Sequence, residues 1–235
     1  MPQPLSNLNK KFVIHIANSN DSPSSHRPKL ALFAMSVIAE WSILDSWLNS
    51  LFVTLLGSET DAATTIYTSL SGGAAKKAAF QAIANKTLIG EQLEVFNIIM
   101  AKIGKAANQR NNIAHWVWGH APDLPDAVLI GDPAALMLYS IALQKHSQLR
   151  PGRTDPIPDM PYERIFIYRQ GDFEELSKTI NKLMGWVMEF KLSVDPVRFF
   201  PEDNQPFEQL LQQPEIQQAL LRAHRKTQAT QQPSH

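Results

Sequence analysis

A long run of residues without glycine or proline constrains the fold of this chain most strongly. It extends from Lys29 to Leu56 and is followed directly by Gly57. Helix-forming residues with a glycine just beyond them predict a single long helix that ends near Gly57. We expect Glu40 and Asp45 to share a wet edge of this helix and most of its remaining surface to be buried. The apolar residues expected to face inward are Leu32, Met35, Ile43 and Leu51.

The rest of the chain predicts a mainly α-helical protein with a small β insertion. Apolar residues recur at helical spacing in several further stretches, and short alternating stretches indicate strands. Further helices are predicted over residues 62–70, 74–87, 91–115, 173–192 and 207–225, with Asp172 as the cap of the fourth. Strands are predicted over residues 127–132 and 164–169, and residues 134–144 are consistent with either a strand or a helix.

Changes in composition divide the chain into three parts. Residues 1–28 are polar and rich in Asn, Ser and Pro, and they predict an irregular N-terminal arm. Residues 29–195 predict a helical bundle, with the β insertion at about 116–169 placed before the last helix. Residues 196–235 form a Pro- and Gln-rich tail that we expect to be partly helical. Whether its helix binds a partner or its own bundle stays open.

The overall composition excludes several classes of function. The chain has no cysteine, which excludes disulfides, thiolate metal sites and cysteine nucleophiles. Its formal net charge is zero, so no general field attracts nucleic acid or a membrane surface. The N-terminus lacks the pattern of a secretory signal, and acidic residues interrupt the apolar run from Leu30 to Leu56. We therefore predict a cytoplasmic protein without a membrane partner.

The segment from Gln109 to His115 is the candidate active site, because it concentrates polar side chains at the end of an apolar helix. The guanidinium of Arg110 is a permanent cation whose shape suits a phosphate. The imidazole of His115 can accept a proton near neutral pH. These two groups suffice for RNA cleavage without a metal ion: His115 would take the proton of a ribose 2′-hydroxyl, and Arg110 would stabilise charge on the phosphate.

The spacing of these two residues poses a geometric problem. Five residues correspond to about 140° of rotation on a regular helix, so Arg110 and His115 do not lie on one face. A frayed helix end, a bulge or the length of the arginine side chain would bring them together within one chain. Alternatively, two copies of the segment meet across a dimer interface.

The pattern Arg110-Asn111-x-x-x-His115 resembles the Arg-x4-6-His motif of HEPN domains, in which a polar residue directly after the arginine is favoured. The order of a long first helix, a helix ending in the motif and a closing helix is also similar. The resemblance implies a four-helix up-and-down bundle that forms a homodimer with two motifs facing each other. It implies a metal-independent endoribonuclease in toxin–antitoxin, phage-defence or RNA-processing systems, with an antitoxin or other protein as a further partner.

The same resemblance implies a role for each motif residue. Arg110 would bind the phosphate and the transition state, His115 would act as base or acid, and Asn111 would orient them. No cofactor and no metal ion are implied.

Structural roles for the motif are the alternative. Arg110 and His115 could cap the helix or organise the surface of a non-catalytic dimeric interaction module. Asn111 and Asn112 could simply terminate the helix. Glu40 and Asp45 could contact the motif from the facing helix, although an exposed edge is the simpler interpretation. A third hypothesis is a nucleotide or small-ligand sensor that uses Arg110 as a phosphate clamp.

Other candidate groups carry less weight. His115 and His120, with Asp123 or Asp126, lack the spacing of known metal-binding motifs. Trp116 and Trp118 are expected to pack rather than to stack on bases. Five basic residues near a proline-rich loop at 146–162 are expected to be solvated, with a lip that guides RNA as the functional alternative. They are Lys145, Arg150, Arg153, Arg164 and Arg169.

Overall fold

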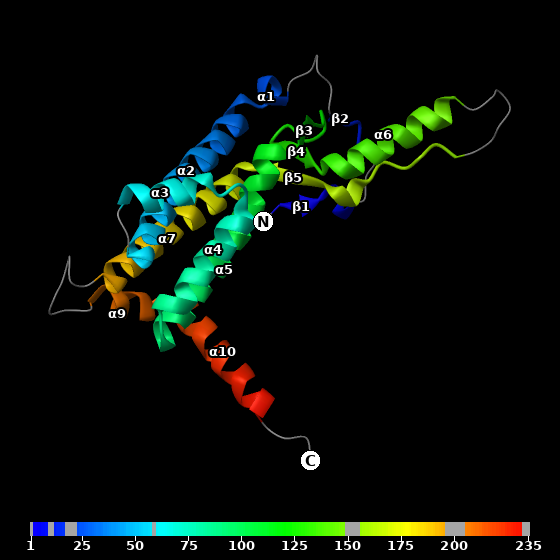
Figure 1. Ribbon diagram of the computed structural model, residues 1–235. Helices are drawn as coiled ribbons and strands as arrows, with labels where there is room; N and C mark the ends of the chain where they lie inside the picture. Colours follow the sequence, from blue (N-terminus) through cyan, green and yellow to red (C-terminus); the bar gives the residue numbers. More distant parts are fainter. Residues whose placement is uncertain are drawn as a thin grey trace. The chain divides into compact units, whose positions relative to one another are not determined.

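The computed structural model is mainly α-helical with a small antiparallel sheet, as predicted (Figure 1). Its nine described helices exceed the four expected of a simple bundle. The structure describes residues 2–8, 12–16, 23–57, 60–148, 156–195 and 205–231.

The helices are α1 (Pro23–His26), α2 (Pro28–Leu56), α3 (Thr60–Ser69), α4 (Gly73–Thr87), α5 (Gly90–His115), α6 (Pro133–Ser147), α7 (Gln170–Val194), α9 (Gln205–Leu211) and α10 (Pro214–Gln231). Two short 3-10 helices are η1 (Leu5–Asn7) and η2 (Tyr162–Arg164). The strands are β1 (Gln3–Pro4), β2 (His15–Ile16), β3 (Val117–His120), β4 (Ala127–Gly131) and β5 (Ile165–Arg169).

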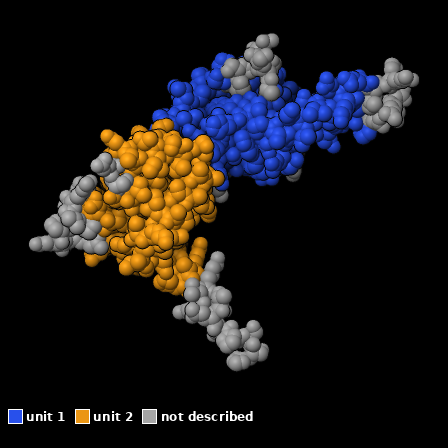
Figure 2. Space-filling model, viewed as in Figure 1, with its two compact units in different colours: residues 1–39, 107–178 blue, residues 40–106, 179–235 orange. Residues whose placement is uncertain are grey.

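The chain forms two compact units (Figure 2). Unit 1 contains residues 1–39 and 107–178, and unit 2 contains residues 40–106 and 179–235. Helices α2, α5 and α7 each begin in one unit and end in the other. Each unit is therefore built from segments that are distant in sequence, which a division along the chain does not reveal.

Unit 2 is a helical assembly around an aromatic core. The ring of Phe52 on α2 lies 5.4 Å from Tyr67 on α3 and 5.3 Å from Phe80 on α4. The contacts continue through Phe96 on α5 to Phe190 on α7, with centroid separations of 6.1 and 6.0 Å. Tilted and edge-on rings at these distances attract each other in addition to burying apolar surface. One line of rings thus joins five helices.

The C-terminal helices α9 and α10 bury their apolar side chains within unit 2, so the tail contributes to the fold. The buried residues are Phe207, Leu210, Ile216 and Leu220. Lys182 on α7 is paired with Glu215 at the start of α10, with 2.5 Å between Nζ and Oε1. The question left open by the sequence is answered here: this amphipathic tail packs on its own unit.

Unit 1 is organised by a five-stranded antiparallel sheet in the order β1-β5-β4-β3-β2. Side chains alternate between its two faces, as strand geometry requires. Ile165 and Ile167 of β5 belong to a core with Leu129 of β4 and Leu136 of α6. On the next positions of β5, Phe166 contacts Trp116 and Tyr168 contacts Phe173 at the start of α7. The end of α5 and the start of α7 thus supply residues to one face.

The N-terminal arm differs from the prediction of an irregular segment, because it supplies both edge strands. Residues 3–4 pair with β5, and residues 15–16 pair with β3. Leu5 is only 1% exposed and lies in the core of the sheet. The sheet is therefore more than an insertion between helices. Strands of two residues carry no measurable alternation, which is why the sequence does not predict them.

The inward face predicted for α2 is wrong at three of four positions. Leu32, Met35 and Ile43 are 64%, 65% and 51% exposed, whereas Leu51 is buried. The buried side runs instead through Leu30, Ala34, Val37, Leu44 and Leu48. Apolar residues occur all around this helix, so periodicity does not define which side is covered.

Helix α2 is also less buried than expected, with 22% of its most apolar stretch buried. Among the described helices, it is the one that is long and apolar enough to cross a membrane by length and composition. Core helices of soluble proteins share those two properties. The cytoplasmic location therefore stays a prediction.

Several local predictions are confirmed. The strands predicted over 127–132 and 164–169 are β4 and β5. The stretch with two interpretations is helix α6, in which the Asp132 carboxylate accepts a hydrogen bond of 2.9 Å from the Ala134 amide and Pro133 occupies the first turn. Asp172 does cap α7 from within its first turn, where it accepts a hydrogen bond from the Arg169 amide.

Candidate active site

The candidate motif lies in the last two turns of α5, which remains helical from Gly90 to His115. The amide of Trp116 still donates to the carbonyl of Asn112, at 3.0 Å. The chain then enters β3 at Val117. The interpretation of Asn111 and Asn112 as helix terminators is therefore wrong, and the motif is carried on regular backbone.

Contacts to the sheet fix the end of α5 in place. The Trp118 indole donates to the carbonyl of Ile113 at 2.9 Å, and the side chain of Asn112 hydrogen-bonds the Tyr168 hydroxyl. The Trp116 ring lies 5.8 Å from that of Phe166. Both tryptophans thus have the packing roles expected of them. A site on this backbone is held by a rigid element rather than by a loop.

Tyr168 contacts the helix that carries the motif through Asn112, but its role is structural. Burial raises the pKa of Tyr168 to about 12, with the Asn112 hydrogen bond opposing and the Asp172 charge adding to this rise. The phenol therefore stays protonated at neutral pH. An acid or base that works near neutrality has to come from another side chain, and His115 is the candidate on this helix.

The three motif residues differ in exposure. Arg110 is half-buried, whereas Asn111 and His115 are exposed. Arg110 Nη1 donates a hydrogen bond of 3.1 Å to Asn111 Oδ1, so the amide oxygen orients the guanidinium. This contact fits the orienting role that the family resemblance assigns to Asn111.

Arg110 and His115 project from different sides of α5. Because the helix is regular through residue 115, about 140° separates the two side-chain directions. The described backbone has neither the frayed end nor the bulge that would reduce this angle. A single copy therefore offers a guanidinium on one side and an imidazole on another.

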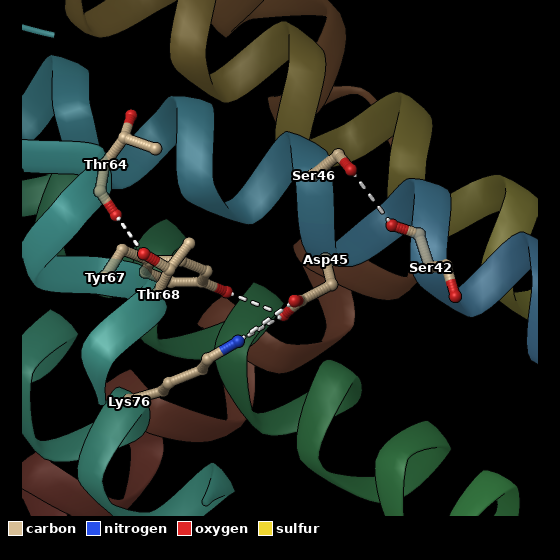
Figure 3. A network of polar contacts seen from close by, with 7 residues as sticks. All are labelled: Ser42, Asp45, Ser46, Thr64, Tyr67, Thr68 and Lys76. Atoms are coloured by element: carbon tan, nitrogen blue, oxygen red, sulfur yellow. Dashed lines mark hydrogen bonds and ion pairs between the residues drawn. The ribbon is translucent and has the colours of Figure 1, made fainter. Parts of the chain in front are cut away.

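Other groups of unit 2 engage Asp45 (Figure 3). Its carboxylate accepts a hydrogen bond of 2.7 Å from the Tyr67 hydroxyl and lies 2.9 Å from the ammonium of Lys76. The same ammonium lies 4.2 Å from the centre of the Tyr67 ring. Burial, together with this hydrogen bond and the nearby negative charge, raises the pKa of Tyr67. We call Asp45, Tyr67 and Lys76 the Asp45 cluster; it joins α2, α3 and α4.

Two of the basic residues near the proline-rich loop are engaged in ion pairs. Arg164 pairs with Asp132, and Arg169 Nε lies 2.8 Å from Asp126 Oδ2. These arginines contribute to the sheet and to the start of α6 rather than to an open basic lip. Arg150 and Arg153 lie outside the described residues.

A stack of histidines in unit 1 was not predicted from the sequence. His120 is 5% exposed, and its ring lies 4.9 Å from that of His15 and 4.3 Å from that of His26. His15 and His120 are partners across β2 and β3, so sheet register rather than sequence spacing brings them together. Over the part of the chain that the structure describes, no three His, Asp or Glu side chains are placed to hold a metal ion.

Comparison with models of known families, with curated proteins and with solved structures gives no match. The functional interpretation consequently depends on the motif and on its setting at the end of α5.

Proposed function

We propose that this protein is a HEPN-like, metal-independent endoribonuclease that works as a homodimer, in bacterial defence or stress. The observation that carries the proposal is the setting of the motif: an exposed His115, an exposed Asn111 and an Arg110 oriented by Asn111, all on a helix end that the sheet holds in place. The long helices α2, α4, α5 and α7 would correspond to the four helices of a HEPN bundle. An antitoxin-like protein is a further proposed partner.

The proposed reaction uses the ribose of the RNA as its nucleophile. His115 would accept the proton of the 2′-hydroxyl as its oxygen attacks the adjacent phosphorus. Arg110 would stabilise the charge that develops on the phosphate oxygens. The bond from phosphorus to the 5′-oxygen breaks, and that oxygen takes a proton from water. The products carry a 2′,3′-cyclic phosphate and a 5′-hydroxyl.

The angle between Arg110 and His115 makes the dimer part of this proposal. In a two-fold dimer, Arg110 of one copy and His115 of the other would form a composite site, and two such sites would exist. This arrangement satisfies the chemistry without unwinding α5. A non-catalytic module that binds RNA or protein through the same exposed segment is the second candidate, favoured by the separation of the two side chains within one copy.

The first test is cleavage of end-labelled RNA by the full chain in excess chelator. We expect products with cyclic-phosphate ends and a loss of about 100-fold or more for Arg110→Ala and for His115→Gln. Matched controls are Arg222→Ala and His224→Gln, which alter an exposed arginine and an exposed histidine of unit 2. RNA that is bound but left intact by every form of the protein would support the non-catalytic module instead.

A mixing experiment tests the composite site. When the Arg110→Ala and His115→Gln variants are unfolded together and refolded, half of the dimers contain one copy of each. If the site combines two copies, one site of each mixed dimer is intact, and about a quarter of the parent activity returns. If both residues act within one copy, the mixture stays as inactive as the separate variants.

A further inference from the structure

Helix α6 presents an apolar surface that the described residues leave uncovered. Met137 and Leu138 are 66% and 69% exposed, and Ile141 is 38% exposed. Together with the exposed Ala134, these residues follow the spacing i, i+3, i+4, i+7 and form one stripe. We call these four residues the α6 stripe. Figure 1 shows α6 extending away from the strands of the sheet.

The composition of α6 is typical of a helix that is covered on both sides. Its single buried residue, Leu136, packs into the core of the sheet from one side. No charged residue occurs from Pro133 to Gln144, and most of the exposed residues in this stretch are apolar. A helix that is apolar all around is normally buried, and a short helix depends on packing for its stability. A single copy supplies that packing on one side.

The charges at the ends of α6 identify the occupant. At the N-terminal end, Arg164 and Asp132 pair with each other, and the exposed Glu163 directly before Arg164 leaves this end with one net negative charge. At the C-terminal end, Lys145 is exposed and His146 lies in the last turn. Two α6 helices side by side in antiparallel orientation place acid next to base at both ends, whereas a parallel pair places like charges together. Antiparallel helix dipoles also attract each other.

We propose that the α6 stripe binds the α6 stripe of a second copy of this chain, as an antiparallel helix pair about a two-fold axis near Leu138. Such an interface is isologous, because each copy contributes the same residues. The inference stands without the ribonuclease proposal, since it uses residues outside the motif.

The mass of the full chain in solution tests the proposal. A single helix pair is a small interface, so the measurement needs a concentration series, at about 1–100 μM. We expect the mass to rise from monomer to dimer across this series. Leu138→Lys should stay monomeric, because it places two ammonium groups together at the axis. The matched control is Ile89→Lys, which puts the same charge on a residue that is 82% exposed outside α6; it should behave like the parent.

Cysteine cross-linking tests the geometry of the α6 pair even if Leu138→Lys affects folding. The chain has no cysteine, so single cysteine variants are free of background. Leu138→Cys should form a disulfide-linked dimer, because the two positions meet near the axis. Gln144→Cys should not link to itself, because six residues on each side separate the two positions by about 18 Å, well beyond disulfide reach. Ala134→Cys mixed with Ile141→Cys should link, because both positions lie on the stripe and the axis near Leu138 places them opposite each other.

Several results would overturn the proposal. They are a parent that is monomeric throughout the series, a Leu138→Lys variant that still dimerises, and Gln144→Cys that links to itself as readily as Leu138→Cys. A monomeric parent that sediments with phospholipid vesicles, and loses that binding with Leu138→Lys, would assign the stripe to a lipid surface instead. None of these measurements depends on RNA cleavage, so this proposal and the ribonuclease proposal fail separately.

Discussion

Two groups of polar side chains, the Asp45 cluster and the motif at the end of α5, are arranged differently. In the Asp45 cluster, a carboxylate on α2 is held by a phenol from α3 and an ammonium from α4. In the motif at the end of α5, Arg110 donates to its neighbour Asn111, and Asn111 and His115 face solvent. The Asp45 cluster joins elements that are distant in sequence, whereas Asn111 and His115 present their groups to solvent and Arg110 is half-buried.

This difference separates groups that stabilise the fold from exposed groups, such as Asn111 and His115, that a ligand can reach. Removing one member of a cross-linked cluster leaves its partners without their charge or hydrogen bond. Removing an exposed polar side chain leaves nothing unsatisfied. Stability measurements on both regions can therefore test the functional assignment without any knowledge of the ligand.

The largest effect on stability is expected for Asp45→Ala. It leaves the Lys76 ammonium and the nearly buried Tyr67 hydroxyl without their acceptor, and we expect a loss of about 2 kcal/mol. The loss stays below that of a fully buried pair because the Asp45 and Lys76 side chains are 39% and 26% exposed. Urea unfolding of Asp45→Ala, Lys76→Met and the double variant measures it. The double variant should lose less than the sum of the single variants; simple additivity would mean that the cluster is not coupled.

A smaller loss of stability, which depends on pH, is expected when Asp132 is substituted. Burial alone would raise the pKa of Asp132, but the hydrogen bond from Arg164, the Ala134 amide and the charge of Arg164 together hold it below the ordinary 3.8. The unfolded chain therefore binds this proton more tightly than the folded one. The resulting stabilisation is complete above the unfolded-state pKa and is lost as the pH falls through the folded-state pKa.

Asp132→Ala should accordingly cost about 1 kcal/mol at neutral pH, as the loss of a helix cap does. The variant should also lose less stability than the parent between about pH 7 and pH 3. Urea unfolding at both pH values measures this difference. Asp159→Ala, an exposed carboxylate of the same unit, is the control and should keep the parent's dependence. An equal acid loss in Asp132→Ala and the parent would show that Asp132 is not the group responsible.

The sequence predicts elements whose signal is local. Helix α5 and strands β4 and β5 each depend on neighbouring residues and are found as expected. Asp172 caps α7 from inside its first turn, because the helix begins at Gln170 rather than after Asp172. The position of the motif at the end of α5 is predicted for the same reason.

Features that depend on contacts between distant segments were not predicted. Lys76 meets Asp45 across 31 residues, and no pattern in either helix reveals the pairing. The covered side of α2 depends on which neighbours pack against it, and its apolar residues on all sides give no preference. The two-residue strands β1 and β2 are defined by their partners alone. In the proposed composite site, Arg110 and His115 meet across two copies, and contacts between copies cannot be read from the pattern of one chain.

The smallest effects are expected for the motif itself, and they give the sharpest contrast with the Asp45 cluster. Asn111 is exposed within a regular helix, so Asn111→Ala should stabilise the protein slightly, by about 0.5 kcal/mol or less, through its higher helix propensity. His115→Gln should change the free energy of unfolding by no more than about 0.5 kcal/mol, because its exposed side chain leaves no buried partner behind. Urea unfolding under the conditions used for Asp45→Ala measures both.

A loss above about 1 kcal/mol in either variant would place that residue among the structural groups and remove it from the proposed active site. Unchanged stability combined with lost RNA cleavage would mean instead that α5 holds these side chains for chemistry rather than for folding.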